Sequence, residues 1–215
     1  MPRCRPASRR STPGRSRAAG RSRPATGSPG GRRARLRDPL RHDGQRGRDR
    51  HRHLPGRLSE EGRRQAAEPV ARRHDGGFAV LFTSDLHRAV ETGRIAFPDG
   101  VPPLHQDVRL RECDCGDLNG APADLVAAQR LRRVDEPFPG GQSYRQVVAA
   151  TDALLRDLAA RWDGRRVLLI AHSANRWALD HLLTGVPLAD VIADPPAWRP
   201  GRHDTLPVDW PARAR

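Results

Sequence analysis

Two short runs of apolar residues constrain the fold of this chain more than any other feature. The runs are Phe78–Phe82 and Val167–Ile170, and neither contains a polar residue. A continuous apolar run of this length is typical of a strand that is covered on both faces, and such strands belong to parallel sheets. Each run is followed by a segment with helical spacing. The sequence therefore predicts an α/β domain with a largely parallel sheet.

The clearest helix is predicted over residues 143–162. Its apolar residues recur at the spacing of one helix face: Tyr144, Val147, Val148, Leu154, Leu155, Leu158, Ala159 and Trp162. Three more helices are expected: one from about Leu58, which Pro69 should bend or shorten, one after Thr83–Asp85, and one over 174–184. Residues 108–112 are expected to be a strand or an extended segment.

Charge divides the chain into two parts. Residues 1–57 hold 18 Arg and 3 acidic residues, whereas residues 58–215 hold 21 Arg and 22 acidic residues. All nine aromatic residues lie at Phe78 or later. An arginine-rich segment without aromatic residues cannot bury enough apolar surface to offset the entropy of ordering. We expect residues 1–38 to be disordered, residues 39–200 to form the domain, and residues 201–215 to be an irregular tail.

Cysteine content and hydropathy indicate the compartment. Three cysteines are too few for a disulfide framework, so we expect a reducing environment and a cytoplasmic protein. No apolar run approaches the length that spans a bilayer, so no membrane partner is expected. The pairs His51-x-His53 and Cys113-x-Cys115 have no third ligand nearby in the sequence, so neither a metal nor a cofactor is expected.

Arg88 and His172 follow the two predicted strands, whose carboxyl ends should meet at one edge of the sheet, and Glu112 is a third candidate residue because it lies among arginines. Arg88 can bind an anion at a helix start, or it can form an ion pair with Glu91 or Asp85. His172 can donate or accept a proton, or it can be an ordinary core histidine. Glu112 can act as a general acid if it is partly desolvated, or it can join an ion pair.

Several motifs in order resemble the histidine phosphatase superfamily, which has the phosphoglycerate mutase-like fold. The resemblance covers about residues 54–187. The segments that carry it are Leu58-Ser59-x-x-Gly62-x-x-Gln65-Ala66, Ser84-Asp85-Leu86-x-Arg88-Ala89-x-x-Thr92, Leu110-Arg111-Glu112-x-x-x-Gly116-x-x-x-Gly120, Pro139-Gly140-Gly141-x-Ser143 and Ile170-Ala171-His172-Ser173.

The resemblance implies a three-layer α/β/α sandwich and a metal-independent phosphomonoester hydrolase or phosphoryl-transfer mutase. Its substrate would be a small phosphorylated metabolite, and a histidine would attack phosphorus. Carried over by motif, the catalytic residues are His42 as nucleophile, Glu112 as proton donor and His172 as second histidine. The substrate-binding residues implied are Arg41, Arg88 and Ser173.

The nucleophile motif departs from the family pattern. The best match is Leu40-Arg41-His42-Asp43-Gly44, in which Asp43 replaces a glycine and places a negative charge where phosphate would bind. Residues 32–39 are also too rich in Arg and Gly to predict a buried strand. A GC-rich gene translated in the wrong frame gives such lysine-free, arginine-rich sequence. Either His42 is the nucleophile of an impaired enzyme, or residues 1–52 are out of frame, and the nucleotide sequence decides between them.

Two other functions remain open from the sequence. The chain can be a catalytically silent module that binds a phosphorylated ligand. Alternatively, its arginine-rich front can bind nucleic acid through phosphates without sequence specificity. The absence of aromatic residues from that front argues against base stacking, so nucleic acid is not the partner we expect. The sequence does not distinguish phosphatase from mutase, and it does not fix the oligomeric state.

Overall fold

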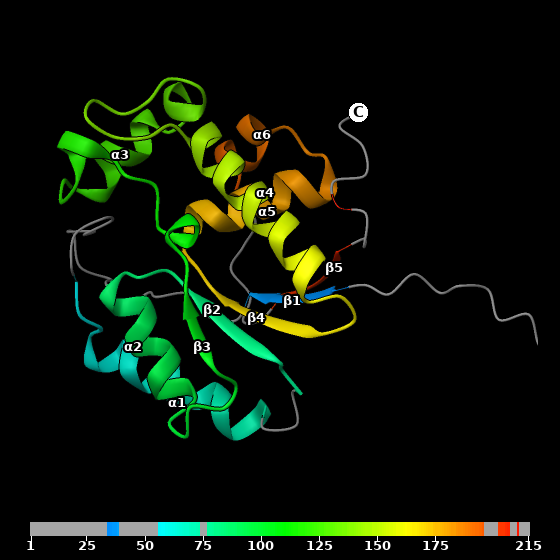
Figure 1. The fold of residues 1–215 in the computed structure, drawn as a ribbon. Helices are drawn as coiled ribbons and strands as arrows, with labels where there is room; N and C mark the ends of the chain where they lie inside the picture. Colours follow the sequence, from blue (N-terminus) through cyan, green and yellow to red (C-terminus); the bar gives the residue numbers. More distant parts are fainter. Residues whose placement is uncertain (1–33, 39–55, 74–76, 196–201, 207–209, 211–215) are drawn as a thin grey trace, which may run out of the picture. The chain divides into compact units, whose positions relative to one another are not determined.

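A five-stranded sheet lies at the centre of the fold (Figure 1). The computed structural model describes residues 34–38, 56–73, 77–195, 202–206 and 210, all of which belong to one unit spanning Gly31–Arg215. The strand order is β3-β2-β4-β1-β5, and all neighbours are parallel except β1 and β5. The strands are β1 (Ala34–Asp38), β2 (Val80–Thr83), β3 (Leu104–Gln106), β4 (Arg166–Ile170) and β5 (Arg202–Leu206).

Strand β4 shows why the apolar runs are continuous. Val167 and Leu169 pack into a cluster with leucines of the long helix α4 (Tyr144–Arg161). Leu168 and Ile170 point to the other face and pack with Ala89 of helix α2 (His87–Ala96). Successive side chains of a strand alternate between faces, so a strand between two helix layers needs apolar residues at every position.

The helices complete a three-layer sandwich, as the resemblance implies. Figure 1 shows α2 and α1 (Glu60–Arg73) on one side of the sheet, and α4 and α5 (Ser173–Thr184) on the other. Helix α2 packs closely because Gly93 faces the sheet, where an added Cβ would lie 2.6 Å from Leu104 Cδ1. A short helix, α6 (Leu188–Ala193), packs against α5.

The segment between β3 and α4 holds short elements and one close backbone contact. Its elements are the 3₁₀ turns η1 (Val108–Leu110), η2 (Gly116–Leu118) and η3 (Arg132–Val134), and helix α3 (Ala123–Gln129). Gly116 has φ +54°, and an added Cβ there would lie 2.6 Å from the carbonyl carbon of Gly140. Two of the sequence motifs thus pack backbone against backbone, which explains their glycines.

The structure corrects the expectations for both ends of the chain. Residues 34–38 form β1, inside the segment 1–38 that we expected to be disordered, and 202–206 form β5, inside the tail expected to be irregular. Backbone pairing explains both strands, because Leu36 is in register with Val167 on one side and with Asp204 on the other. Leu206 is fully buried in the core, so the tail contributes to the fold.

The structure also corrects two smaller expectations in part. Residues 108–110 form the turn η1 instead of a strand, because the carboxylate of Asp107 accepts the backbone N–H of Arg109 at 2.9 Å and starts the turn. Pro69 does not shorten the first helix, which continues to Arg73.

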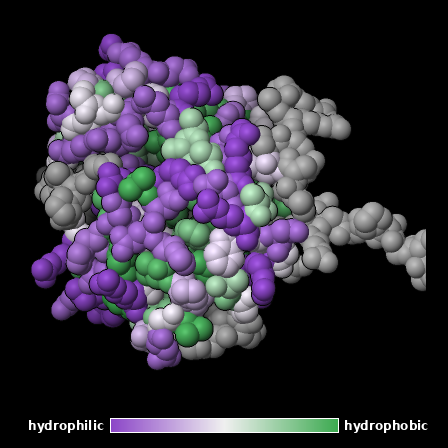
Figure 2. All heavy atoms as spheres, viewed as in Figure 1, coloured by the Kyte–Doolittle hydropathy of each residue, from purple (hydrophilic) through white to green (hydrophobic). Residues whose placement is uncertain are grey.

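The surface is mainly polar on the face that Figure 2 shows, where hydrophilic side chains surround smaller hydrophobic areas. The large hydrophobic residues that are exposed in the described part come from separate segments: Val101, Val108, Leu125, Leu131 and Val186. Among the helices of the described residues, none combines the length and the apolar character needed to cross a membrane.

Candidate active site

Ser84 and His172 meet at the carboxyl edge of the sheet. Ser84 follows β2 and His172 follows β4, the two strands being parallel neighbours. Ser84 Oγ lies 2.7 Å from His172 Nε2, and both residues are buried. The sequence predicted that the ends of these strands would meet, and the structure confirms it.

Arg88 contacts the other nitrogen of the same ring. Its Nη2 lies 3.3 Å from His172 Nδ1. A guanidinium only donates hydrogen bonds, so Nδ1 must accept, and the proton of the neutral imidazole is then on Nε2, which donates to Ser84 Oγ. The two contacts therefore fix both the orientation and the tautomer of His172.

Burial alters the properties of Arg88. Desolvation lowers the pKa of its guanidinium, and the negative charge of Glu112 partly offsets this effect. The two acidic residues near Arg88 in the sequence each have another arginine partner. Asp85 instead binds Arg111 through two hydrogen bonds, one of them from Arg111 Nε at 2.6 Å, and Glu91 forms an ion pair with Arg63. A desolvated cation of this kind gains from binding an anion such as phosphate.

Glu112 is held by backbone N–H groups at the start of α5. Its Oε1 accepts from Cys113 at 3.0 Å and from Ala174 at 3.1 Å, and its Oε2 accepts from Ser173 at 3.2 Å. The side chain is buried, and the helix start favours a carboxylate through its dipole. The structure therefore places Glu112, Arg88 and His172 together, as the sequence predicted.

The sequence also assigned Ser173, Arg41 and His42 to the site. Ser173 is partly buried, and its contact with the site is the backbone N–H that Glu112 accepts. Arg41 and His42 lie outside the described residues, as do His51 and His53.

Two residues of the site were not assigned a role from the sequence. Ser84 was part of a motif, but its contact with His172 depends on two strands being neighbours. Asn175 is fully buried, and its Oδ1 accepts the backbone N–H of His172 at 3.1 Å. A possible signal for Asn175 was its place in the first turn of the helix that follows His172, where a polar side chain often caps.

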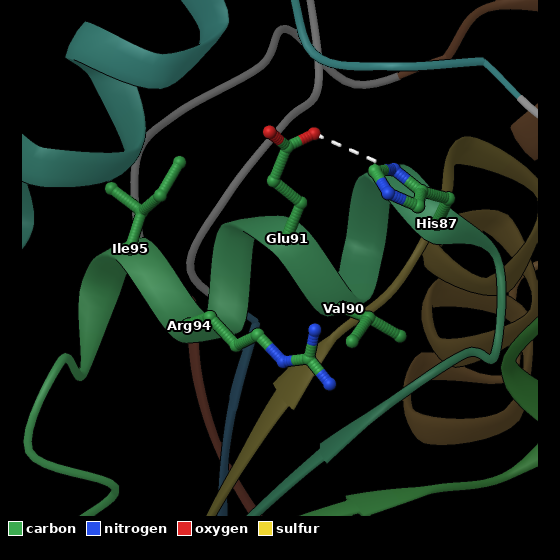
Figure 3. Close-up of a pocket in the computed structure, with 5 residues that line it drawn as sticks. All are labelled: His87, Val90, Glu91, Arg94 and Ile95. Carbon is green, nitrogen blue, oxygen red and sulfur yellow. Dashed lines mark ion pairs between the residues drawn. The ribbon is translucent and has the colours of Figure 1, made fainter.

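A cavity of about 300 Å³ lies along helix α2 (Figure 3). His87, Val90, Glu91, Arg94 and Ile95 line it. His87 Nδ1 lies 3.5 Å from Glu91 Oε2, the ion pair drawn in Figure 3. None of the residues that converge on His172 is part of this lining, so the reactive groups and this cavity are separate features.

The site can bind an oxyanion and transfer a proton. Arg88 offers N–H donors, His172 offers a ring that can donate or accept, and Glu112 offers a carboxyl group. Oxyanions such as phosphate esters match this combination, because phosphoryl transfer depends on positive charge around the phosphoryl oxygens and on protonation of the leaving group.

Known proteins are similar to this chain in sequence and in fold. Glucosyl-3-phosphoglycerate phosphatase of Mycobacterium tuberculosis is 33% identical over 156 residues, which cover 64% of this chain and 68% of that protein. "Probable phosphoglycerate mutase GpmB" of an Enterobacter species is 28% identical over 138 residues, covering 60% of this chain. The chain thus spans 64% of the length of that mutase relative. The solved structure of Bacillus stearothermophilus YhfR superposes with a TM-score of 0.65 at 25% identity, covering 78% of this chain and 87% of YhfR.

A family comparison covers the same part of the chain. The family model described as histidine phosphatase superfamily (branch 1) matches residues 41–194, which include Arg88, Glu112 and His172. The resemblance inferred from the motifs is thereby confirmed, and so is the phosphoglycerate mutase-like fold. This chain belongs to the histidine phosphatase superfamily.

Proposed function

We propose that this protein is a phosphomonoester hydrolase that works without a metal ion and acts on a small phosphorylated metabolite. The observation that carries the proposal is the convergence of Arg88, His172 and Glu112 at one edge of the sheet. In this reaction Arg88 and His172 bind the phosphoryl oxygens, where positive charge stabilises the transition state.

Glu112 donates the proton that the leaving group needs. A nucleophilic histidine attacks phosphorus, so that a P–N bond forms while the P–O ester bond breaks. Glu112 gives its proton to the departing oxygen. Water then attacks the phosphohistidine, Glu112 takes a proton from that water, and inorganic phosphate leaves. At the end of the cycle Glu112 carries its proton again and the nucleophilic histidine is free.

His42 is the nucleophile we propose, with Arg41 as a second phosphate ligand. The support comes from β1, which is parallel to β4 and therefore ends, at Asp38, at the same edge of the sheet as His172. His42 follows Asp38 by four positions in the sequence. If residues 1–52 instead prove to be out of frame, the chain as written is a silent phosphate-binding module.

The names of the relatives suggest which substrates to test first. One relative is called a glucosyl-3-phosphoglycerate phosphatase, and the other a phosphoglycerate mutase. We therefore propose a phosphorylated derivative of glyceric acid as substrate. Hydrolysis is favoured over mutase activity because the phosphatase relative has the higher identity, 33% against 28%.

The test is hydrolysis of p-nitrophenyl phosphate and of 3-phosphoglycerate by the full chain in the presence of EDTA. Activity is expected in the wild type. It should fall by about 10²–10³-fold in His172→Ala and in Arg88→Ala, because each removes a donor to the phosphoryl oxygens. His181→Ala is the matched control, because His181 is exposed on the same helix and bonds the carbonyl of Val186. Activity that survives both site substitutions, or that EDTA abolishes, would contradict the proposal.

A further inference from the structure

We propose that Asn175 is a positioning residue that sets the place of Glu112 relative to His172, and this inference rests on the proposed function. Asn175 is fully buried, and its backbone N–H bonds the side chain of His172. Its own side chain bonds to the two backbone segments that carry His172 and Glu112.

The two bonds of Asn175 join segments that are far apart in the sequence. Its Oδ1 accepts the backbone N–H of His172 at 3.1 Å, at the end of β4. Its Nδ2 donates to the backbone carbonyl of Arg109 at 3.3 Å, across 66 positions of the chain. Arg109 precedes Glu112 by three residues. One amide group therefore links the strand that ends at His172 to the segment that delivers Glu112, in addition to the bonds that Glu112 accepts from Ser173 and Ala174.

A second helix of the same chain shows what an ordinary cap looks like. At the start of α4, Gln146 Oε1 accepts the backbone N–H of Ser143 at 2.8 Å, and Ser143 Oγ accepts the N–H of Gln146 at 3.2 Å. Both bonds stay within four residues, and Gln146 is exposed. Asn175 makes the corresponding bond at α5 but adds the long-range bond to Arg109, which a cap does not need.

The Arg109 side chain holds the same segment from the other side. It donates to Asp157 of α4 at 2.8 Å and to Asp107 at 2.7 Å. Without Asn175, this anchor remains but the partly buried carbonyl of Arg109 loses this donor, so the segment can shift with respect to α5. Glu112 would shift with it, whereas Arg88, which belongs to α2, keeps its place.

Because Glu112 and Arg88 belong to different segments, loss of Asn175 should impair protonation of the leaving group more than binding of the phosphoryl group. A misplaced Glu112 protonates the leaving oxygen poorly, while Arg88 still binds the phosphoryl group. Benzyl phosphate needs that proton because its leaving alkoxide is a strong base. p-Nitrophenyl phosphate does not, because nitrophenolate is a stable anion. Loss of Asn175 should therefore impair the first substrate far more than the second.

The experiment compares the full wild-type chain with Asn175→Ala on both substrates. We expect kcat for benzyl phosphate to fall by about 10²-fold, the size of effect that a misplaced catalytic group produces. For p-nitrophenyl phosphate, kcat should fall at least about tenfold less, and KM should change by less than about threefold. Gln146→Ala is the matched control, since it removes a helix cap of the same kind outside the site, and it should leave the ratio of the two rates unchanged.

A second variant provides the same test if Asn175→Ala folds poorly. Asn175→Ser keeps a polar group, but one oxygen cannot occupy the positions of both Oδ1 and Nδ2, so the same selective loss is expected. Equal losses on both substrates in an active, folded variant would overturn the inference and leave the proposed function intact. A wild-type chain that hydrolyses neither substrate would overturn both.

Discussion

Two charged regions of helix α2, around Arg88 and around Glu91, differ in how their charges are balanced. Arg88 contacts the ring of His172, and Glu112 nearby is bonded to backbone N–H groups. Glu91, three residues further along the helix, forms an ion pair with Arg63 and also accepts the backbone N–H of Leu58 at 3.1 Å. Glu91 also lines the cavity of Figure 3.

These contacts separate a structural ion pair from a candidate binding group. The charge of Glu91 is matched by a cation beside it, so this pair connects α1 to α2 and stabilises the fold. Arg88 is desolvated, which lowers the pKa of its guanidinium, and an incoming anion would restore favourable interactions to it. The arrangement of charges, more than the size of a cavity, therefore indicates the reactive site.

The largest effect that distinguishes the two regions is expected for the carboxylates of Glu112 and Glu91. Glu112→Gln keeps the size of the side chain but has no proton to give, so kcat for benzyl phosphate should fall by about 10²–10⁴-fold. Glu91→Gln should leave kcat within about twofold and instead lower the free energy of unfolding by about 1 kcal/mol, the value of a partly exposed ion pair. Steady-state kinetics and urea unfolding of both variants provide the measurement. An active Glu112→Gln enzyme would remove Glu112 from the mechanism.

A smaller effect is expected for Ser84. Ser84→Ala removes the acceptor at His172 Nε2, and an unsatisfied buried donor costs about 1–3 kcal/mol, so kcat/KM should fall by about tenfold or more. The control is Ser59→Ala near α1, where Ser59 Oγ accepts the N–H of Gly62 at 3.1 Å. That change should lower stability by about 1 kcal/mol and leave kcat/KM unchanged. If the two variants have the same kcat/KM, Ser84 does not orient His172.

The smallest effect concerns the ion pair between Asp85 and Arg111, which links the start of α2 to the Glu112 segment. Hydrogen bonding to Asp85 raises the pKa of Arg111, but the two side chains are 27% and 39% exposed. A double-mutant cycle with Asp85→Asn and Arg111→Gln should give a coupling of about 0.5–1 kcal/mol in urea unfolding, and salt should reduce it. A coupling that salt does not change would show that this pair is shielded from solvent.

Much of this fold could be predicted from the sequence, because β2, β4, α4 and α5 each have a clear apolar pattern. The strand β1 has none, since three of its five residues are charged. It forms through backbone pairing with β4 and β5, which no local pattern records. Tertiary contacts of this kind override local preference.

The residues of the site also differ in whether the sequence predicts them. Arg88, Glu112 and His172 could be predicted because motifs and strand ends point to them. The roles of Ser84 and Asn175 could not, because each depends on a partner far away in the chain: His172 is 88 positions from Ser84, and Arg109 is 66 from Asn175. A single sequence does not show which distant segments come into contact.

Binding of inorganic phosphate shows whether Arg88, at the carboxyl edge of the sheet, holds a phosphoryl group. The thermal unfolding of the full chain should shift upward as phosphate is added, by about 2.7 kcal/mol of stabilisation at one hundred times the Kd. Arg94→Ala, which alters an exposed arginine of the cavity lining, should keep this stabilisation, and Arg88→Ala should lose it. Stabilisation that persists in Arg88→Ala and disappears in Arg94→Ala would contradict the account.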